Sequence, residues 1–578
     1  MKTLVFDIET DHLNASILWC IVAIDDDDKV HSFYGDKLEE GLAFLNTADR
    51  LVGHNILGFD IPVLKKLYGW QPKKSIEIID TLVLSRLFNP TREKGHSLER
   101  WGIKLGQHKI EFSDFSEFSM DMVKYCIQDT KVNKLLFKHL RTEALGFSRE
   151  SINLEHQTTS IITQQTIDGF EFDLKSATFL ISKFNRLLKE TEEEVHKTFK
   201  PKWVEDKEVK PFTKKDGTLS KRGLTDEEYE DIIKGLRPKK PFMRKKLQHF
   251  NLGSRKQIGE YLSDFGWKPR KFTPTGQPIV DETTLKEIEH IYEAKLIANY
   301  LLYQKRLAQV QSWIDALDDD GRVHGSVICT GAITGRMSHQ NPNVAQVPSV
   351  KSPFGDECRE CWTVPEGYKL VGVDASGLEL RMLAHYMDDK EYINEILNGD
   401  IHATNQRIVG LKSRDKAKTF IYALIYGAGD QKIGSIVGGD KSDGKELKHR
   451  FFAGQPSFNS LRERVQRASR KGFLKGLDGR KIILRHQHAA LNTLLQGGGA
   501  IVMKKALCLL DERLKLANID FKFVANIHDE WQIEVRECQA MRVGSLAVTS
   551  IKDAGDYYKL RCPLDGEYKI GSNWSETH

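Results

Sequence analysis

The sequence predicts an α/β protein of several domains. Its 578 residues are enough for three or four domains at about 100–200 residues each. Residues 1 to about 150 alternate strand-like and helical patterns. Residues 151 to about 320 contain long amphipathic stretches typical of helices, such as 184–199 and 286–307.

The composition is that of a chain with sizeable cores and no export segment. Hydrophobic residues make up 40% of the chain and charged residues 29%. No run of about 18 apolar residues appears, and Asp7 comes too early for a signal peptide. Eight cysteines in so long a chain do not indicate a disulfide framework, so a reducing cytosol is expected. We therefore expect neither a targeting signal nor membrane association.

Acidic residues in the first 150 positions are spaced as in a metal site. Asp7 and Glu9 are two apart on a predicted strand, so both point to one face. Asp60 follows a second apolar run, and Tyr125 and Asp129 are neighbours on one helix face. Taken singly, each acid is better explained as a solvated surface carboxylate. Taken together, four carboxylates and a tyrosine would form a two-metal hydrolytic site in which Tyr125 orients the attacking water.

The formal charge is concentrated in one segment. Residues 201–250 contain 14 Lys/Arg and 9 Asp/Glu, so their excess equals the +5 of the whole chain. Pro and Gly breakers with little apolar periodicity predict an extended loop or a small subdomain here.

Two strand patterns near the centre and end of the chain lead to carboxylates. A short apolar strand ends on Asp374, and a helical pattern follows. Residues 523–535 predict a strand, a tight turn around Asp529 and a second strand. Asp374 and Asp529 could hold two magnesium ions about 3.5–4 Å apart. Mg²⁺ suits such a site because it binds few protein carboxylates and keeps positions for phosphate oxygens and water.

A stripe of four residues lies between these strands. Arg414, Lys418, Tyr422 and Tyr426 recur every four residues, so they follow one face of a helix. Two cations followed by two rings suit a triphosphate with a base attached. The alternative is an ordinary amphipathic helix with solvated basic residues and snorkelling tyrosines.

Three consecutive glycines, Gly497 to Gly499, lie within a helical pattern. Each costs about 1 kcal/mol relative to alanine. Close approach of nucleic acid or of a sheet would explain them.

The strand at Asp374, the stripe and the turn at Asp529 resemble motifs A, B and C of family A DNA polymerases. Three further stretches carry a similarity to the replicative polymerases of T-seven-like podophages: Asp374-Ala-Ser-Gly-Leu-Glu-Leu-Arg381, Leu397-Asn-Gly-Asp-Ile-His402 and His488-Ala-Ala-Leu-Asn-Thr-Leu-Leu-Gln496. The resemblance covers nearly the whole chain. It implies a right-hand architecture of palm, fingers and thumb, and DNA-templated extension of a primer.

The resemblance assigns metal ligands at the polymerase site. Asp374 and Asp529 would hold two Mg²⁺ ions with the carbonyl of Ala375, and Glu530 is carried over as an acidic neighbour. One ion would activate the primer hydroxyl, and the other would stabilise the leaving pyrophosphate.

Roles toward nucleotide and DNA follow from the same resemblance. Six side chains are assigned to the incoming deoxynucleoside triphosphate: His402, Arg414, Lys418, Tyr422, Glu379 and Tyr426. The first three contact the triphosphate, Tyr422 packs on the sugar and base, Glu379 excludes a 2′-hydroxyl, and Tyr426 lies by the templating base. Four further side chains are assigned to the primer–template: Arg336, Asn492, Gln496 and His528. Part of that contact would use minor-groove acceptors, which are common to all correct base pairs.

The N-terminal acids are similar to those of the DEDDy class of 3′→5′ exonucleases. The matching residues are Asp7, Glu9, Asp60, Tyr125 and Asp129. This resemblance implies a ribonuclease-H-like domain that binds two Mg²⁺ ions and removes misincorporated nucleotides.

The resemblance also implies domain boundaries. The exonuclease domain would span 1–150, and the thumb 151–320 with a basic insertion at about 201–249. The palm would be divided into 321–400 and 488–578, with the fingers at 401–487 between the two parts.

Partners are implied in the same way. The chain would act on primer–template DNA in the cytoplasm of an infected bacterium, together with a replisome helicase–primase. In the resembled phage enzymes an insertion at this point of the thumb binds host thioredoxin, but residues 201–249 are shorter and dissimilar. Thioredoxin or another processivity factor, a cationic flap that holds DNA phosphates, and a solvated loop remain as alternatives. We expect DNA retention, with or without a protein helper.

Two other functions compete with this interpretation. A single-subunit RNA polymerase shares a similar palm and fingers, but Glu379 and the nuclease acids argue against it. A DNA-binding or exonuclease-only protein with a vestigial polymerase half is disfavoured because both acid sets are complete.

Overall fold

The computed structural model describes residues 1–269 and 271–578, which form two compact units. The first unit combines Met1–Asp173 with Ala316–His578, and the second is Leu174–Asp315. The family resemblance implied a boundary at residue 151, whereas the second compact unit begins at Leu174. The difference arises because helix α6 (Arg149–Asp168) packs on other elements of the first unit.

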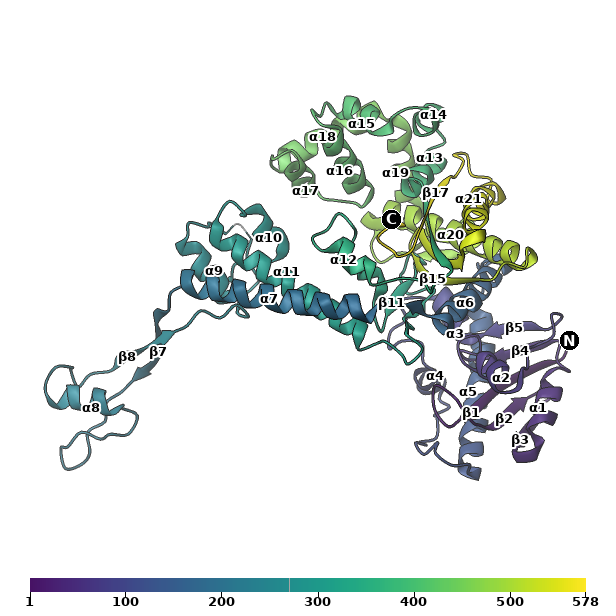
Figure 1. Ribbon diagram of the computed structural model, residues 1–578, viewed down its shortest axis with the longest axis horizontal. Coiled ribbons are helices and arrows are strands. Elements are labelled where there is room, and N and C mark those ends of the chain that lie inside the picture. Colours follow the sequence, from purple (N-terminus) through teal and green to yellow (C-terminus); the bar gives the residue numbers. More distant parts are fainter. Residues whose placement is uncertain (270) are drawn as a thin grey trace. The chain divides into compact units, whose positions relative to one another are not determined.

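The first unit begins with a five-stranded sheet (Figure 1). Its order is β3-β2-β1-β4-β5, with β2 antiparallel to both neighbours and β1, β4 and β5 mutually parallel. The strands are β1 (Thr3–Thr10), β2 (Leu18–Ile24), β3 (Val30–Tyr34), β4 (Arg50–Gly53) and β5 (Glu77–Asp80). The helices around it are η1 (Gly35–Lys37), α1 (Leu38–Leu45), α2 (Asp60–Tyr68), α3 (Thr81–Phe88), α4 (Leu98–Leu105) and α5 (Met120–Glu143). The α/β pattern predicted for residues 1–150 is present.

Side chains alternate along β1 and divide the faces of this sheet. Leu4, Phe6 and Ile8 are buried in a core shared with α1 and α2. The other face of β1 packs against α5. Asp7 and Glu9 lie on that second face, because residues two apart on a strand share a face.

A second, antiparallel sheet has the order β15-β16-β12-β17. Its strands are β12 (Tyr368–Ala375), β15 (Phe521–Ile527), β16 (Glu530–Arg536) and β17 (Gly566–Gly571). Helices α20 (Ala490–Leu516) and α21 (Ala540–Tyr557) pack together, and α21 also packs on β12 and β17. The strand–turn–strand at 523–535 is confirmed, as is the strand ending near Asp374, which α13 (Leu378–Met387) follows.

Six helices connect α13 to the C-terminal part of this unit. They are α14 (Lys390–Asn398), α15 (Ile401–Val409), α16 (Arg414–Ile425), α17 (Asp430–Ile436), α18 (Lys441–Gly454) and α19 (Pro456–Ser469). Short elements complete the unit: β6 (Phe170–Glu171), β9 (Arg322–Val323), β10 (Ser326–Ile328), β11 (Ser338–Gln340), η2 (Val344–Gln346), α12 (Gly355–Glu360), β13 (Phe473–Lys475), β14 (Lys481–Ile483), η3 (Gln487–Ala489) and η4 (Glu537–Gln539).

Helix α20 is a core helix. The stretch Gln487–Leu516 has the length and hydropathy of a membrane span, but 72% of its most apolar window is buried in the fold. Two of its three glycines allow α13 to approach, since a Cβ on Gly498 would lie 2.6 Å from Met382 Cε and one on Gly499 3.2 Å from Leu378 Cδ2. The third, Gly497, faces β14, since a Cβ there would lie 2.8 Å from Ile482 Cδ1. A helix is therefore the close neighbour of Gly498 and Gly499, whereas a strand of the two-stranded β13–β14 sheet is the close neighbour of Gly497.

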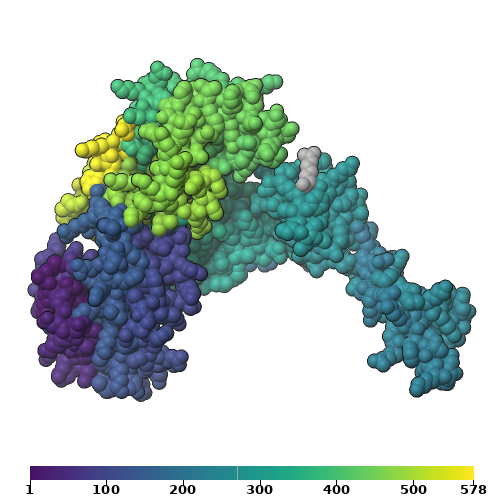
Figure 2. Space-filling view, turned by 180° about the vertical axis from the view of Figure 1, so that it is seen from behind, coloured from purple at the N-terminus to yellow at the C-terminus, as the bar shows by residue number. Residues whose placement is uncertain are grey.

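The second unit is helical, with a long β-hairpin. Helices α7 (Leu174–Thr198) and α11 (Tyr292–Ile314) pack together, and α9 (Arg255–Asp264) and α10 (Glu282–Glu287) complete the helical part. Strands β7 (Lys202–Val209) and β8 (Phe242–Gln248) form the hairpin, which carries α8 (Asp226–Ile233). We call Lys202–Gln248 the arm; it projects from the helices of its own unit (Figures 1 and 2). The small subdomain predicted for the basic segment is this arm.

Candidate active sites

Asp374 and Asp529 lie at one end of the second sheet. Asp374 is the last residue but one of β12, directly opposite Glu530 on β16. Asp529 is in the β15–β16 turn, and its backbone oxygen accepts a hydrogen bond of 3.1 Å from the amide of Ala375. The preceding turn residue, His528, has a φ of 58°, which directs the chain sharply from one strand into the next. The sheet therefore brings together two carboxylates that are 155 positions apart in the sequence.

The electrostatics of this pair favour a cation. Desolvation of the carboxylate by the surrounding protein, and then the negative charges of Asp529 and Glu530, raise the pKa of Asp374 to about 7. Partial burial, and then the charge of Glu379, raise the pKa of Asp529 to about 6. A divalent ion would relieve this repulsion, and oxygen ligands are those that Mg²⁺ prefers. The donor set therefore fits the expected metal.

Glu530 is held by the C-terminal segment. Its Oε1 accepts hydrogen bonds of 2.7 Å from both Trp574 Nε1 and Gln532 Nε2, and its Oε2 lies 3.1 Å from His578 Nδ1. Burial disfavours the charged form, but the hydrogen bonds and charge of His578 prevail and lower the pKa of Glu530. Its two oxygens are thus already engaged, whereas Asp374 and Asp529 form no ion pair with any residue that the structure describes.

Glu379 is fixed by two donors. Arg336 Nη2 and the hydroxyl of Tyr426 both donate to its Oε1, at 2.9 Å and 3.1 Å. The Tyr426 ring stacks near that of Tyr422, with centroids 6.4 Å apart and an interplanar angle of 26°. The structure therefore brings together Arg336, which precedes β11, Glu379 of α13 and Tyr426 at the end of α16. The sequence predicted a role for each of them only singly.

The predicted stripe follows the outer face of α16. Arg414 and Lys418 are exposed, Tyr422 is half-buried, and Phe420 and Ile421 on the opposite side are buried in the core. The Tyr422 ring centroid lies 6.2 Å from that of His402, whose Nδ1 is buried without a hydrogen-bond partner among the described residues.

Arg414 is paired with an acid that sequence reasoning did not assign. Its Nε and Nη2 donate to the two carboxylate oxygens of Asp400, at 2.6 Å and 3.1 Å. Asp400 also caps α15, accepting a hydrogen bond of 3.0 Å from the amide of His402. The hydrogen bond from Arg414 lowers the pKa of Asp400 to about 2. An acid directly before a helical pattern is an N-cap signal that was available in the sequence.

Two predicted DNA contacts lie on α20. Asn492 and Gln496 are one turn apart and partly exposed, and Asn492 Oδ1 has no hydrogen-bond partner among the described residues.

A second acid cluster lies between β1 and α5. Burial is the main cause that raises the carboxyl pKa of all four predicted acids: Asp7, Glu9, Asp60 and Asp129. The charges of Asp129 and Asp60 add to burial at Glu9, whose pKa rises to about 8. At Asp60 burial is joined by the charge of Asp80, and its pKa rises to about 7. Asp60 Oδ1 and Asp129 Oδ1 are buried without hydrogen-bond partners among the described residues. Unsatisfied carboxylate oxygens at this density fit divalent cations.

A lysine missed by sequence reasoning joins two members of this cluster. Lys109 Nζ lies 2.5 Å from Asp129 Oδ2 and 4.9 Å from the ring centroid of Tyr125. Lys109 belongs to the connection between α4 and α5, whose Phe112 and Phe115 also pack on the Tyr125 ring, at 5.6 Å and 5.9 Å. The connection carries no motif, so only the tertiary structure identifies Lys109.

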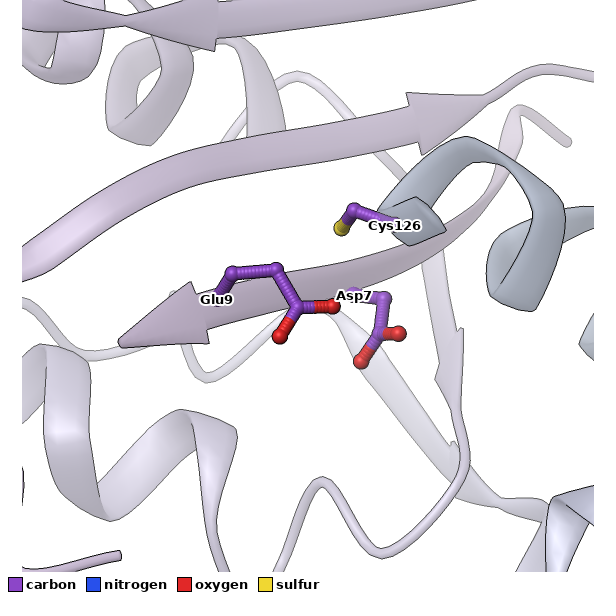
Figure 3. A group of neighbouring side chains, drawn as sticks. All are labelled: Asp7, Glu9 and Cys126. Carbon is purple, nitrogen blue, oxygen red and sulfur yellow. The ribbon is translucent and has the colours of Figure 1, made fainter. Parts of the chain in front are cut away.

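A thiol also faces the cluster. One potential ligand atom from each of Asp7, Glu9 and Cys126 lies within 4.8 Å of the others. Figure 3 shows the two carboxylates on one strand and the Cys126 sulfur directed from the neighbouring helix toward Glu9. Cys126 directly follows Tyr125 in the sequence, but its type did not match a carboxylate motif.

Comparison with known proteins identifies the polymerase family that the sequence motifs resemble. Residues 225–576 match the family model described as DNA polymerase family A. The DNA-directed DNA polymerase of Enterobacteria phage T3 is 34% identical with full coverage of both chains, and that of Escherichia phage T7 is 33% identical over 94% of each. The T3 alignment spans 707 positions, so that relative has stretches which this chain lacks.

A solved structure has the same fold. It is described as the POL domain of Pol1 from M. smegmatis in complex with DNA primer-template and dNTP, and it superposes with a TM-score of 0.79 at 19% identity. It covers 100% of this chain and 96% of its own. The family model matches more than half of the chain, and the two phage relatives match it almost end to end. The chain therefore belongs to DNA polymerase family A.

Proposed function

We infer that this chain, a DNA-directed DNA polymerase by its family, extends a primer at Asp374 and Asp529 and removes 3′-terminal nucleotides at the acid cluster of β1 and α5. The observation that carries this inference is the presence of two separate carboxylate clusters with raised pKa values. In the cluster of β1 and α5, the Oδ1 atoms of Asp60 and Asp129 also have no hydrogen-bond partner among the described residues. Enzymes of this family depend on divalent metal ions; we propose two Mg²⁺ ions at each site.

At the polymerase site, the Asp374 and Asp529 carboxylates and the carbonyl of Ala375 would hold the ions. When bound, the ions supply Lewis-acid activation of the primer hydroxyl and neutralise charge on the phosphates. Arg414 would exchange Asp400 for a phosphate, since a guanidinium forms the same forked pair with either anion. Lys418, one turn later, would add a second cation to the triphosphate.

Selection of the sugar would depend on Glu379. Because Arg336 and Tyr426 both donate to its carboxylate, Glu379 cannot turn aside without losing two hydrogen bonds. The fixed Glu379 side chain would therefore exclude a 2′-hydroxyl sterically, while the Tyr422 ring would pack against the sugar and base.

At the nuclease site, Asp7, Glu9, Asp60 and Asp129 would bind the ions, which when bound activate water and stabilise the charged phosphate. The Tyr125 phenol would orient that water. Phe112 and Phe115 pack on its ring and limit its rotation.

Domain roles follow from these sites. We propose that the second sheet is the palm, α14–α19 are the fingers, the first sheet with α1–α5 is the exonuclease domain, and Leu174–Asp315 is the thumb. The first part of the palm then includes β9–β12 and α13, and the second part begins near α20.

The arm would retain duplex DNA. Seven of its exposed basic residues make no ion pair among the described residues: Lys207, Lys214, Lys215, Arg222, Lys239, Lys240 and Lys245. The others are neutralised by nearby acids, as Arg244 is by Glu228 and Lys246 by Asp206. Unpaired cations on an exposed arm suit phosphate contacts. A thioredoxin-like or other processivity factor, and a helicase–primase, remain proposed partners.

Substitution of the polymerase acids tests the main function. Asp374→Asn or Asp529→Asn should abolish primer extension, because loss of a metal ligand removes several kcal/mol of transition-state stabilisation. Duplex binding should remain. Extension of a primed template with deoxynucleotides and ribonucleotides, assayed separately, also tests the RNA polymerase alternative. Near-normal extension by either variant would refute the assignment.

The nuclease acids are tested independently. Asp7→Ala combined with Glu9→Ala should eliminate degradation of single-stranded 3′ ends while primer extension continues, since the two clusters lie on different sheets. Continued degradation by the double variant would show that the nuclease metals bind elsewhere.

A further inference from the structure

A cavity of about 340 Å³ lies within the first unit, where the two sheets of that unit are joined by α6. Its walls come from α3, α6, the connection between β4 and α2, and the β10–β11 hairpin. Helices α3 and α6 pack on each other along one side (Figure 1). This volume falls at the small end of the range for ligand sites, about 300–1,000 Å³.

The cavity contains a single charged side chain among the described residues. Arg86 of α3 is the only Lys, Arg, Asp or Glu that lines it. The other polar side chains on its walls are threonine and serine hydroxyls and two amides. No acid in the lining would therefore repel an anion.

The Arg86 guanidinium has no partner within the described part of the fold. It forms no hydrogen bond or ion pair there, although the side chain is only partly exposed. Asp80 acts on it electrostatically, but both Asp80 oxygens already accept backbone hydrogen bonds, from Asn55 at 2.9 Å and from Leu57 at 3.1 Å. A half-buried cation without a counter-ion is costly, so Arg86 points to an anionic ligand.

Two hydroxyls are available beside Arg86. Thr163 on α6 and Ser326 on β10 line the same cavity, and neither side chain forms a hydrogen bond with any residue that the structure describes. By contrast, the hydroxyl of Thr330 in the same lining already donates to Glu155 at 2.9 Å. Free hydroxyls from two different elements add donors for an anion with several oxygens.

We propose that this cavity binds a nucleotide phosphate group through the Arg86 guanidinium, with the Thr163 and Ser326 hydroxyls as further donors. A guanidinium forms forked, charge-assisted hydrogen bonds with two oxygens of one phosphate. The phosphate has further oxygens for the two hydroxyls. Arg86 lies outside every motif that the sequence analysis used.

The place of the cavity relates it to the strand that the nuclease would degrade. Asn55 and Gly58 line it, and the same connection reaches Asp60 two residues after Gly58. Ser326 belongs to the β10–β11 hairpin, whose connection carries Arg336, a predicted primer–template contact. A single strand that passes from Arg336 toward Asp60 would bring a phosphate to Arg86. This use rests on the proposed nuclease function; a released mononucleotide is the other source of the same group.

Chemical modification tests the site at the level of the residue and without any activity assay. Phenylglyoxal should modify Arg86 in the full chain without divalent ions, because the guanidinium is unpaired. A ten-nucleotide single-stranded oligothymidylate should protect Arg86, which mass spectrometry of the digested protein measures. At ten times the half-protecting concentration, modification should be about 10-fold slower, since about one site in eleven is then free.

Arg100 provides the internal control in the same digest. It is an exposed arginine on α4 without an ion pair among the described residues, and it does not line the cavity. Its modification rate should not change with the oligonucleotide.

Two further probes distinguish the sources of the phosphate. Protection of Arg86 by dTMP as well as by oligothymidylate shows that the phosphate group alone is recognised. Protection by the oligonucleotide alone assigns the site to the strand, and protection by dTMP alone assigns it to a mononucleotide. Thymidine, which lacks the phosphate, should not protect.

Degradation kinetics provide the second readout. Arg86→Gln removes a contact made equally before and during the reaction, so KM for single-stranded DNA should rise about 10-fold or more with kcat little changed. Arg100→Gln removes the same charge elsewhere and should alter neither value. Equal urea midpoints for the two variants and the parent chain serve as the folding control.

The outcomes separate this proposal from the nuclease assignment. Protection of Arg86 without any detectable degradation supports the phosphate site and counts against the nuclease alone. Degradation by the parent chain, with Arg86 modified at the same rate under every probe, would overturn the phosphate site and leave the nuclease intact. An unchanged KM in folded Arg86→Gln, together with no protection by dTMP, would also overturn it.

Discussion

Lys109 shows how a single residue outside any motif can organise a site. Its ammonium bridges the Asp129 carboxylate and the Tyr125 ring, so it neutralises one acid and orients the phenol beside it. The same acid carries an oxygen without a partner, which points to a second, cationic ligand. We therefore treat Lys109 as a positioning residue for the proposed nuclease.

Replacing Lys109 should slow degradation more than it weakens DNA binding. Lys109→Ala removes a charge-assisted hydrogen bond of about 1.5–3 kcal/mol, so kcat should fall about 10- to 100-fold with KM for single-stranded DNA little changed. Lys109→Arg should restore most of the rate.

The control is Lys104→Ala, which removes a half-exposed lysine from the preceding helix α4 without touching the acids. Equal kcat values for the two alanine variants would exclude a positioning role for Lys109.

Tyr422 should set the response to dideoxynucleotides. In family A enzymes, tyrosine at this place accompanies ready acceptance of dideoxynucleotides, because the phenol hydroxyl can replace interactions lost with the 3′-hydroxyl. We expect efficient chain termination by the parent chain and weaker termination by Tyr422→Phe. Comparison of termination ladders at equal extension rates measures this, and identical ladders would contradict the role.

At the scale of elements, a buried charge cluster joins α6 to the polymerase part of the first unit. Glu155 on α6 accepts hydrogen bonds from Lys504 on α20, at 2.7 Å and 2.8 Å, and from Arg480 next to β14, at 2.5 Å. Arg480 also pairs with Asp478 at 2.6 Å. Opposed by burial, the two cations still lower the pKa of Glu155 to about 2. This cluster explains why α6 belongs to the first unit.

Breaking the cluster should destabilise the first unit. Glu155→Gln removes the acidic partner of buried Lys504 and leaves buried Arg480 with Asp478 alone, which costs about 3–5 kcal/mol. Because the folded-state pKa of Glu155 is below its ordinary value, the stabilisation is present above about pH 4.5 and is lost as pH falls toward 2. The difference in urea midpoint between parent and variant should therefore shrink over that range.

Glu512→Gln is the matched control, since Glu512 is an exposed glutamate on α20, the helix that carries Lys504. A pH-independent difference for Glu155→Gln, or an equal loss in both variants, would show that the ion pairs do not stabilise the fold.

At the scale of the whole molecule, we propose that the arm prolongs binding to DNA. Val204 and Lys246 are register partners in the hairpin, so residues 205–245 can be replaced by a two-residue turn such as Asn-Gly. The deletion should shorten the products of one binding event, while insertion of a single nucleotide is little changed. Each lost phosphate contact should reduce the salt slope of duplex binding by about 0.9.

A variant with neutralised basic residues separates the effect of phosphate contacts from the effect of the arm's size. Neutralising the seven unpaired basic residues of the arm should reproduce the deletion, whereas neutralising paired Lys234 and Lys246 should have less effect. Product lengths measured with a DNA trap, with and without thioredoxin, decide between the three explanations of this segment. If the deletion changes neither the product lengths nor the salt slope of duplex binding, the segment is a solvated loop without a role in DNA retention.

The sequence by itself determined the local elements and the acids they carry. Helix α16 with its exposed stripe, the strand ending near Asp374 and the turn at Asp529 follow from periodicity, which depends only on residues a few positions apart. The family resemblance followed from the same residues because its motifs are short and continuous.

Only the tertiary structure decided which partners these residues have. The C-terminal residues His578 and Trp574 bind the Glu530 carboxylate, and Asp400 forms an ion pair with Arg414. Lys109 pairs with Asp129, and Cys126 lies beside Asp7 and Glu9. Likewise, α6 falls within the first unit because Glu155 pairs with Arg480 and Lys504, which are more than 300 positions away in the sequence. Periodicity cannot reveal such pairs, because they form when separate elements pack and bury charges that must then find the nearest opposite charge or hydrogen-bond donor.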